Sequence, residues 1–461
     1  MMPIPRRCRR HTTRHRSPHP RAAAAFQRLL GVLAAAWATA LAAAGTAAEP
    51  IDLERAAATA RRAGLSIHEG HHLLLLSDRP AADTAVAELP KIFDEAFVSW
   101  CDHFGIAADS LADWRALGCL MTRRDTFRAC GLLPDTIPDF ENGFCDRRRF
   151  WIRQPSSPAY RRHLLLHEGV HAFTLTVRNL ATPPWYTEGI AELLATHRLT
   201  DGRFEATPIP VDPGDVEQLG RIEAIRSLRR RQSAPSLAEV FATPADRHHR
   251  IPAYAASWAA VAMLSRHPRY REAFARAERG LLDSQFTSRL EATDGFDTAA
   301  ATRDFDAFTA ELDYGYDPQA MAIDFSVGPP LAGPRSLAVP AARGWHNAGV
   351  SARAGDRCRF RASGRVGLGR LPATAESPAR PIESEADGIS LEWYRGRPLG
   401  RLLVGQWRAA PQRGRPQFER LAEGVDGIFT AAVDGPIFLK INQPPGRLAV
   451  AEGSYRVRLE P

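Results

Sequence analysis

The segment His167-Glu168-Gly169-Val170-His171 constrains the fold of this 461-residue chain more than any other part of the sequence. On an α-helix, side chains four residues apart stand one above the other on the same face. His167 and His171 can then present two imidazole nitrogens to one metal ion, with Glu168 beside that ion. Apolar residues at 164–166 and 172–173 flank the pair. The segment therefore predicts a buried helix that carries a metal site with an adjacent carboxylate.

Two helix starts frame this site. Ser157-Pro158 is typical of an N-cap followed by proline at the first helical position, and Pro183-Pro184 marks a second helix start. On that second helix Glu188 and Glu192 share a face. We expect Glu188 to supply a third metal ligand and Glu192, one turn on, to accept a hydrogen bond from the far nitrogen of a ligating histidine.

Residues 163–192 resemble the gluzincin-type zinc metallopeptidases. Pro183-Pro184-Trp185-Tyr186-Thr187-Glu188-Gly189-Ile190-Ala191-Glu192 is similar to the Pro-x-Trp-x-x-Glu-Gly-x-Ala motif of bacterial peptidase MA-like domains. The resemblance implies Zn²⁺ bound by His167, His171 and Glu188, with Glu168 as the base that takes a proton from zinc-bound water. It also implies an α+β zincin-like metallopeptidase domain, with a small sheet, an active-site helix and a helical C-terminal half. The alternative is a polar helix pair without metal.

A hydrogen-bond donor for the developing oxyanion is also expected from this resemblance. In the resembled families a tyrosine from a helix downstream of the third ligand often has this role, and Tyr254 is the best-placed residue here. His248 and His249 are rival donors. We interpret His163 as a residue on the helix face rather than a ligand, and His197 as a residue at the C-terminal end of a helix.

The first 48 residues have the order of an export signal. They contain eight arginines and no acidic residue, then an apolar run at 29–44, then small residues at 46–48. We favour a cleaved signal peptide over a retained membrane anchor. The absence of cysteine directly after the apolar run argues against a lipoprotein. The chain is therefore expected to be secreted or periplasmic.

Removing these arginines changes the charge argument. The net charge of +8 loses all eight and becomes zero for the remaining residues. Nothing in that balance indicates nucleic acid or an anionic membrane surface as a partner. A peptide or protein substrate is expected, and membrane contact is expected only if the N-terminal segment is retained.

Cysteine and histidine clusters precede the metal-binding segment. In an exported chain, Cys101, Cys119, Cys130 and Cys145 are expected to form two disulfides, with three pairings open. Cys358 is expected to be a buried thiol. The group at 68–72, with three histidines, is interpreted as surface polar residues rather than ligands.

The periodicity divides the mature chain into two domains joined by a linker. The pattern predicts helices at 51–64 and 81–105, strands at 72–77, 118–122 and 150–154, and a helical stretch over 215–312. We assign 49–320 to the zincin-like domain and 321–334, rich in Gly and Pro, to a linker. Beyond it the period is two, which predicts an all-β sandwich over 335–461.

The β domain resembles the bacterial galactophilic lectin sandwich. The similar segments are Gly344-Trp345, Ala354-Gly355-Asp356, Ala362-Ser363-Gly364, Leu402-Leu403-Val404-Gly405, Ile441-Asn442-Gln443-Pro444-Pro445-Gly446 and Gly453-Ser454-Tyr455. In the lectin, the last loops hold calcium. The corresponding residues here, Gln443, Val450 and Ala451, supply too few oxygen ligands, so calcium-dependent galactose binding is not expected.

Three functions follow from these patterns. The leading one is an exported zinc-dependent hydrolase of peptide bonds. The alternative is a surface protein that binds a glycan or another protein through 335–461, with an inactive metallopeptidase-like domain. A structural zinc domain is the third, but such sites seldom place a glutamate beside the first histidine with an open fourth position.

Overall fold

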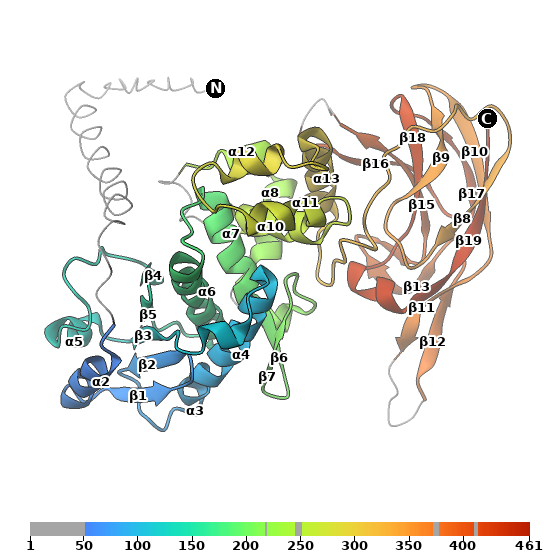
Figure 1. Ribbon diagram of the computed structural model, residues 1–461. Helices are drawn as coiled ribbons and strands as arrows, with labels where there is room; N and C mark the ends of the chain where they lie inside the picture. The colour runs from blue at the N-terminus through green and yellow to red at the C-terminus, as the bar shows by residue number, and fades with distance from the viewer. Residues whose placement is uncertain (1–50, 217–218, 245–250, 372–377, 410–413) are drawn as a thin grey trace, which may run out of the picture. The chain divides into compact units, whose positions relative to one another are not determined.

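The computed structural model describes residues 51–216, 219–244, 251–371, 378–409 and 414–461, which belong to one compact unit, Ile51–Pro461 (Figure 1). The predicted export signal, 1–48, and the rival donors His248 and His249 lie outside these residues. Among the described helices, none has the length and apolar character needed to cross a membrane.

The first part of this unit is a mixed α/β structure built on a five-stranded sheet. Its strand order is β1-β2-β3-β5-β4. The three inner strands are parallel, and the two edge strands run antiparallel to their neighbours. The bounds are β1 Ser66–Glu69, β2 Leu73–Ser77, β3 Ala116–Met121, β4 Gly143–Asp146 and β5 Arg149–Arg153. Three of these strands were predicted, whereas β1 and β4 were not.

The sheet is covered on both faces because its strands are apolar on both faces. In β2, Leu73 and Leu75 pack with α4 (Leu89–Phe104) and α6 (Pro158–Val177). Leu74 and Leu76 face the other way, toward α2 (Leu53–Arg62) and α5 (Arg124–Ala129). Successive side chains on a strand point to opposite faces, so the two leucine pairs build two separate cores. This packing places α6, which carries His167 and His171, against one face.

The helix predicted at 81–105 is two helices, α3 (Thr84–Ala87) and α4. Pro90 causes the break, because proline lacks an N–H and fits only the first turn of a helix. It occupies that turn of α4.

Helices form the rest of the α/β part. As predicted, Ser157 caps α6 by accepting a hydrogen bond from the Tyr160 backbone N–H at 3.2 Å. Helix α7 (Pro184–Ala195) begins at the predicted proline pair and lies beside α6 (Figure 1). A short hairpin of β6 (His197–Thr200) and β7 (Arg203–Ala206) follows. The predicted helical stretch contains α8 Arg221–Arg230, α9 Leu237–Phe241, α10 Ile251–Arg266, α11 Arg271–Arg279, α12 Phe286–Glu291 and α13 Thr298–Glu311.

The C-terminal part is all-β, with curled sheets around one core. One sheet has the order β12-β11-β19-β10-β17, with β8 added beside β19, and the other has the order β16-β15-β18-β9. The hairpin β13–β14 is separate. The bounds are β8 Arg335–Pro340, β9 His346–Ala352, β10 Arg357–Ser363, β11 Val366–Leu371, β12 Arg380–Ser384, β13 Ile389–Tyr394, β14 Arg397–Leu399, β15 Leu402–Arg408, β16 Gln417–Glu423, β17 Asp426–Thr430, β18 Gly435–Ile441 and β19 Ala451–Glu460. The predicted alternation holds in β19, where Tyr455, Val457 and Leu459 are buried.

Residues 321–334 contain no helix or strand, yet the segment is packed. Met321 and Ile323 are buried. Ile323 joins a small apolar cluster with Trp345 and Phe438 of the β part and Ala307 of α13. Beside it, the Lys440 ammonium of β18 donates to the Glu311 carboxylate of α13, and both side chains are buried. The all-β part is therefore joined to α13 by buried contacts as well as by the chain.

The predicted disulfides are absent, and all five described cysteines are free thiols. The sheet separates the four clustered ones. Cys101 and Cys145 pack on the α6 side, whereas Cys119 and Cys130 pack on the α2 side. Cys358 is buried and free, as predicted.

The histidine group before β2 was predicted at the surface, but only His71 is exposed. His68 and His72 are buried. The ring of His72 stacks on Phe97 with centroids 3.7 Å apart, and its Nδ1 lies 2.8 Å from the carbonyl oxygen of Trp114. His72 is therefore part of the packing between β2 and α4.

Candidate metal centre

Three ligand atoms converge between α6 and α7. The Nε2 atoms of His167 and His171 are 3.1 Å apart, and Glu188 Oε2 lies 3.4 Å from the first and 3.5 Å from the second. A tetrahedral zinc ion with bonds of about 2.0–2.1 Å holds its ligand atoms about 3.3 Å apart. The three atoms have this spacing, and all three residues are those expected to bind metal. The residues present therefore fit a zinc ion.

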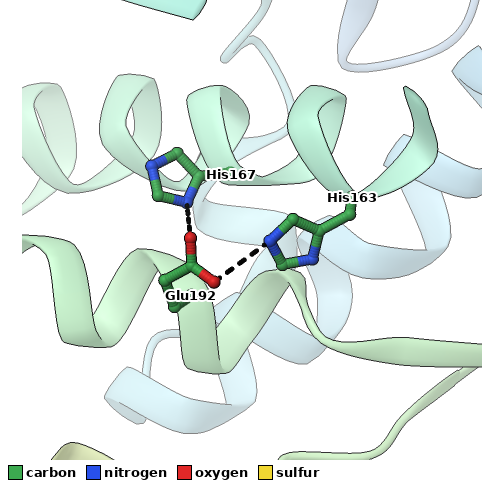
Figure 2. Close-up of side chains that lie close together, drawn as sticks. All are labelled: His163, His167 and Glu192. Atoms are coloured by element: carbon green, nitrogen blue, oxygen red, sulfur yellow. Dashed lines mark ion pairs between the residues drawn. The ribbon is translucent and has the colours of Figure 1, made fainter. Parts of the chain in front are cut away.

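A second group of possible ligands shares His167, but its carboxylate, that of Glu192, is bound by other side chains of the protein. Figure 2 shows Glu192 of α7 between His163 and His167 of α6. Glu192 Oε1 lies 3.3 Å from His167 Nδ1, and Oε2 lies 3.3 Å from His163 Nε2. Arg221 of α8 donates to both oxygens, from Nη2 at 2.7 Å and from Nε at 2.8 Å. Because Glu192 is fully engaged, the group with Glu188 is the better place for an ion.

His163 was interpreted as a residue on the helix face rather than a ligand. It is 4% exposed and contacts Glu192, so its side of α6 faces α7. Glu192 itself lies where it was expected, beside the Nδ1 atom of a candidate ligand. That contact leaves Nε2 of His167 directed toward His171 and Glu188.

Electrostatics at the centre favour a positive charge. Burial alone would lower the pKa of His167, but hydrogen bonds to Glu188 and Glu192 outweigh burial and raise the pKa to about 10. Burial alone would raise the pKa of Glu188, but the charges and hydrogen bonds of His171 and His167 hold that pKa well below its usual value. A carboxylate that stays ionised while buried is suited to a cation.

Glu168 lies one residue from the first ligand and is buried, with 6% of its surface exposed. Burial raises the pKa of its carboxyl, against the charges of His167 and His171. Its side chain packs on edge strand β4, because a Cβ added at Gly143 would overlap the Glu168 carboxylate. Glu168 therefore lies against strand β4, beside the candidate ligands.

Tyr254, near the start of α10, reaches the same centre. Its ring centroid lies 6.0 Å from that of His167, in an edge-on arrangement. The guanidinium carbon of Arg221 lies 5.4 Å from the Tyr254 centroid. Burial, with the nearby charge of Glu188, raises the pKa of Tyr254 far above its usual value. The hydroxyl is therefore protonated and can donate a hydrogen bond.

His197 was expected at the C-terminal end of a helix, but it lies outside the helix. Helix α7 ends at Ala195, and His197 begins β6, where it is buried. Its Nδ1 lies 2.8 Å from the Ala195 carbonyl oxygen, and burial lowers its pKa to about 4. It lines a small hollow with Tyr160 and His163.

Two parts of the site were missed from the sequence. Arg221 belongs to an arginine-rich helix whose other arginines have no part in the site, so its residue type carries no signal. Strand β4 is short and begins with glycine, which gives it no strand pattern. Only the folded chain brings these residues to the centre.

No family model matches this chain. The curated proteins contain no match either. Among solved structures, a weak neighbour is the EclA N-terminal domain, a PllA-like lectin, with 18% identity and a TM-score of 0.19. The similarity covers 27% of this chain and 94% of that one.

Gln443, Val450 and Ala451 are the residues that were compared with the calcium loop of the lectin. The Gln443 side chain donates to the Ala341 carbonyl oxygen at 2.6 Å, and Val450 is exposed. Among the described residues, the groups that could hold a metal ion are the two between α6 and α7.

Proposed function

We propose that the chain is a zincin-like metallopeptidase of the gluzincin type, which hydrolyses peptide bonds with one zinc ion. The observation that supports this best is the spacing of His167 Nε2, His171 Nε2 and Glu188 Oε2, which matches three corners of a zinc tetrahedron. An ion held by these three residues would remain accessible to water and substrate. Zinc in such a site polarises the scissile carbonyl and lowers the pKa of water.

The chain's own residues supply the remaining chemistry. Glu168 is the general base, because it is buried beside the ligands and its raised pKa brings proton transfer closer to neutral pH. Tyr254 donates its hydroxyl hydrogen to the oxyanion that forms on the substrate. Glu192 keeps His167 in the orientation that turns Nε2 toward the ion.

Strand β4 is the proposed substrate platform. It pairs with β5 on one side and, among the described strands, has no partner on the other. Its free edge can add an extended peptide as a further strand. Gly143 on this strand lies against Glu168, so a paired peptide would pass close to the general base.

Metal content and cleavage test this proposal together. The purified chain and its His171→Ala variant are compared by elemental analysis and by digestion of a peptide library. One zinc per chain that is lost in the variant, with cleavage lost in parallel, supports the proposal. A chain that binds no zinc contradicts it, and the alternative binding function of 335–461 then takes its place. Export to the periplasm or outside the cell, as expected from 1–48, is tested by mass analysis of the mature N-terminus.

A further inference from the structure

We propose that Arg221 is a positioning residue of the metal centre. It fixes the Glu192 carboxylate, and through it the ring of His167, and it holds the ring of Tyr254 beside the same histidine. This inference rests on the proposed function, since it assigns a role toward the ion held by His167, His171 and Glu188.

The Glu192 carboxylate is the first point of contact. It is buried, with 2% of its surface exposed, and four nitrogen atoms of three residues lie against it. Each oxygen faces one imidazole nitrogen at 3.3 Å and one guanidinium nitrogen at 2.7–2.8 Å. The guanidinium contacts are the shorter ones, and two parallel N–H donors define the plane of a carboxylate. Arg221 therefore sets the direction in which Glu192 meets His167.

The direction of that contact matters for metal binding. A histidine ligand needs its far nitrogen to donate to an acceptor so that the near nitrogen keeps its lone pair for the ion. If Glu192 rotated, Nδ1 of His167 would lose the carboxylate that faces it and the ring would lose its orientation. Side chains that hold a ligand in this way commonly contribute about 10- to 100-fold to metal affinity.

Tyr254 is the second point of contact. The Arg221 guanidinium lies over its ring, and that ring lies edge-on to His167. A guanidinium stacked on an aromatic face is attracted by the ring electrons. One side chain from α8 thus touches both the carboxylate that orients a ligand and the proposed oxyanion donor. Arg221 is well suited to this role because only 10% of its side chain is exposed.

Zinc affinity of the full chain tests this role through two substitutions. Arg221→Met removes both hydrogen bonds to Glu192. Arg221→Lys keeps the charge but not the two parallel N–H donors of the guanidinium. We expect zinc affinity, measured by chelator competition, to fall about 10- to 100-fold in Arg221→Met and by a smaller factor in Arg221→Lys. The absorption spectrum of the cobalt-substituted chain is expected to change in both. If Arg221→Met does not fold, the zinc affinity and cobalt spectrum of Arg221→Lys test the role of Arg221.

Arg229→Met is the matched control. Arg229 lies on the same helix, its side chain is 11% exposed, and it pairs with Asp306 of α13. We expect this variant to lose thermal stability while it keeps the zinc affinity and the cobalt spectrum of the unmodified chain.

The outcomes separate this inference from the proposed function. If the unmodified chain binds no zinc, both the proposed function and the role of Arg221 are contradicted. If it binds one zinc and both Arg221 variants keep its affinity and spectrum, only the role of Arg221 falls. An equal loss of affinity in Arg229→Met would also overturn that role, because the loss would then follow from the packing of α8.

Discussion

Glu168 and Tyr254 approach the metal centre from different helices and are assigned different parts of the reaction. Both are partly or fully buried, and neither is among the three residues proposed to hold an ion. Substitution of either should therefore separate metal binding from turnover.

Glu168→Gln keeps the size of the side chain but removes the base. We expect the variant to retain one zinc per chain and to lose about 10²- to 10⁴-fold in kcat, which is the usual contribution of a general base. Elemental analysis and a peptide cleavage assay measure the two effects. An unchanged rate would remove Glu168 from the mechanism.

Tyr254→Phe removes one hydroxyl and keeps the ring that stacks with Arg221. Loss of one donor to an oxyanion commonly costs about 10²-fold or more in kcat. We expect kcat to fall by that factor while KM and zinc content stay close to those of the unmodified chain. A change in KM alone would show that the hydroxyl binds substrate before the reaction rather than the oxyanion.

Spacing within one helix explains which of these residues could be foreseen. His167, His171, Glu188 and Glu192 each have a partner three or four residues away, and helix geometry then fixes which side chains share a face. Arg221 has no such relation to Glu192, because the chain passes through β6 and β7 before α8 begins. Its contact depends on how α8 packs, and local pattern does not encode that packing.

At the scale of elements, strand β4 connects the sheet to the metal centre. Its contact with α6 is close at Gly143, where any side chain would meet the Glu168 carboxylate. The absence of a side chain at Gly143 therefore allows the strand to lie this close to the proposed base.

Gly143→Ala should displace the Glu168 carboxylate without touching the ligands. A shift of about 1 Å in a reacting group can cost about 10²-fold in rate, so we expect a loss of that order with zinc retained. Gly333→Ala is the control, since a Cβ there meets open space. Equal rates in the two variants, measured by peptide cleavage, would show that Glu168 tolerates the added methyl group.

Elements with a strong periodic pattern were predicted well, and elements without one were missed. The inner strands β2, β3 and β5 have continuous apolar runs because both of their faces are buried. The edge strands β1 and β4 are four residues long and partly exposed, so they lack such a run. The disulfide prediction was wrong: the sheet separates Cys101 and Cys145 from Cys119 and Cys130, and the thiols on each side are free.

At the scale of the whole molecule, the all-β part and α13 share a buried ion pair between Lys440 and Glu311. Burial would raise the pKa of Glu311, but the charges of Lys440 and Arg395 lower it to about 2. The pair therefore stabilises the fold only while Glu311 is ionised.

Glu311→Gln should destabilise the chain, because it leaves Lys440 buried without its counter-charge. Removing one partner of a buried pair costs about 3–5 kcal/mol. We expect a lower thermal midpoint at pH 7. Because the folded pKa lies below the unfolded one, the difference from the unmodified chain should persist above pH 4.5 and disappear as the pH falls toward 2. A difference that does not depend on pH would assign the loss to packing.

The buried contacts of α13 also bear on what happens when the backbone is cut. A break within 321–334 would leave Glu311 in one fragment and Lys440 in the other, each still carrying a surface matched to its lost neighbour. Trp345 and Phe438 would likewise be parted from Ala307. The two fragments, mixed in solution, should therefore associate and restore the complete fold, as in fragment complementation.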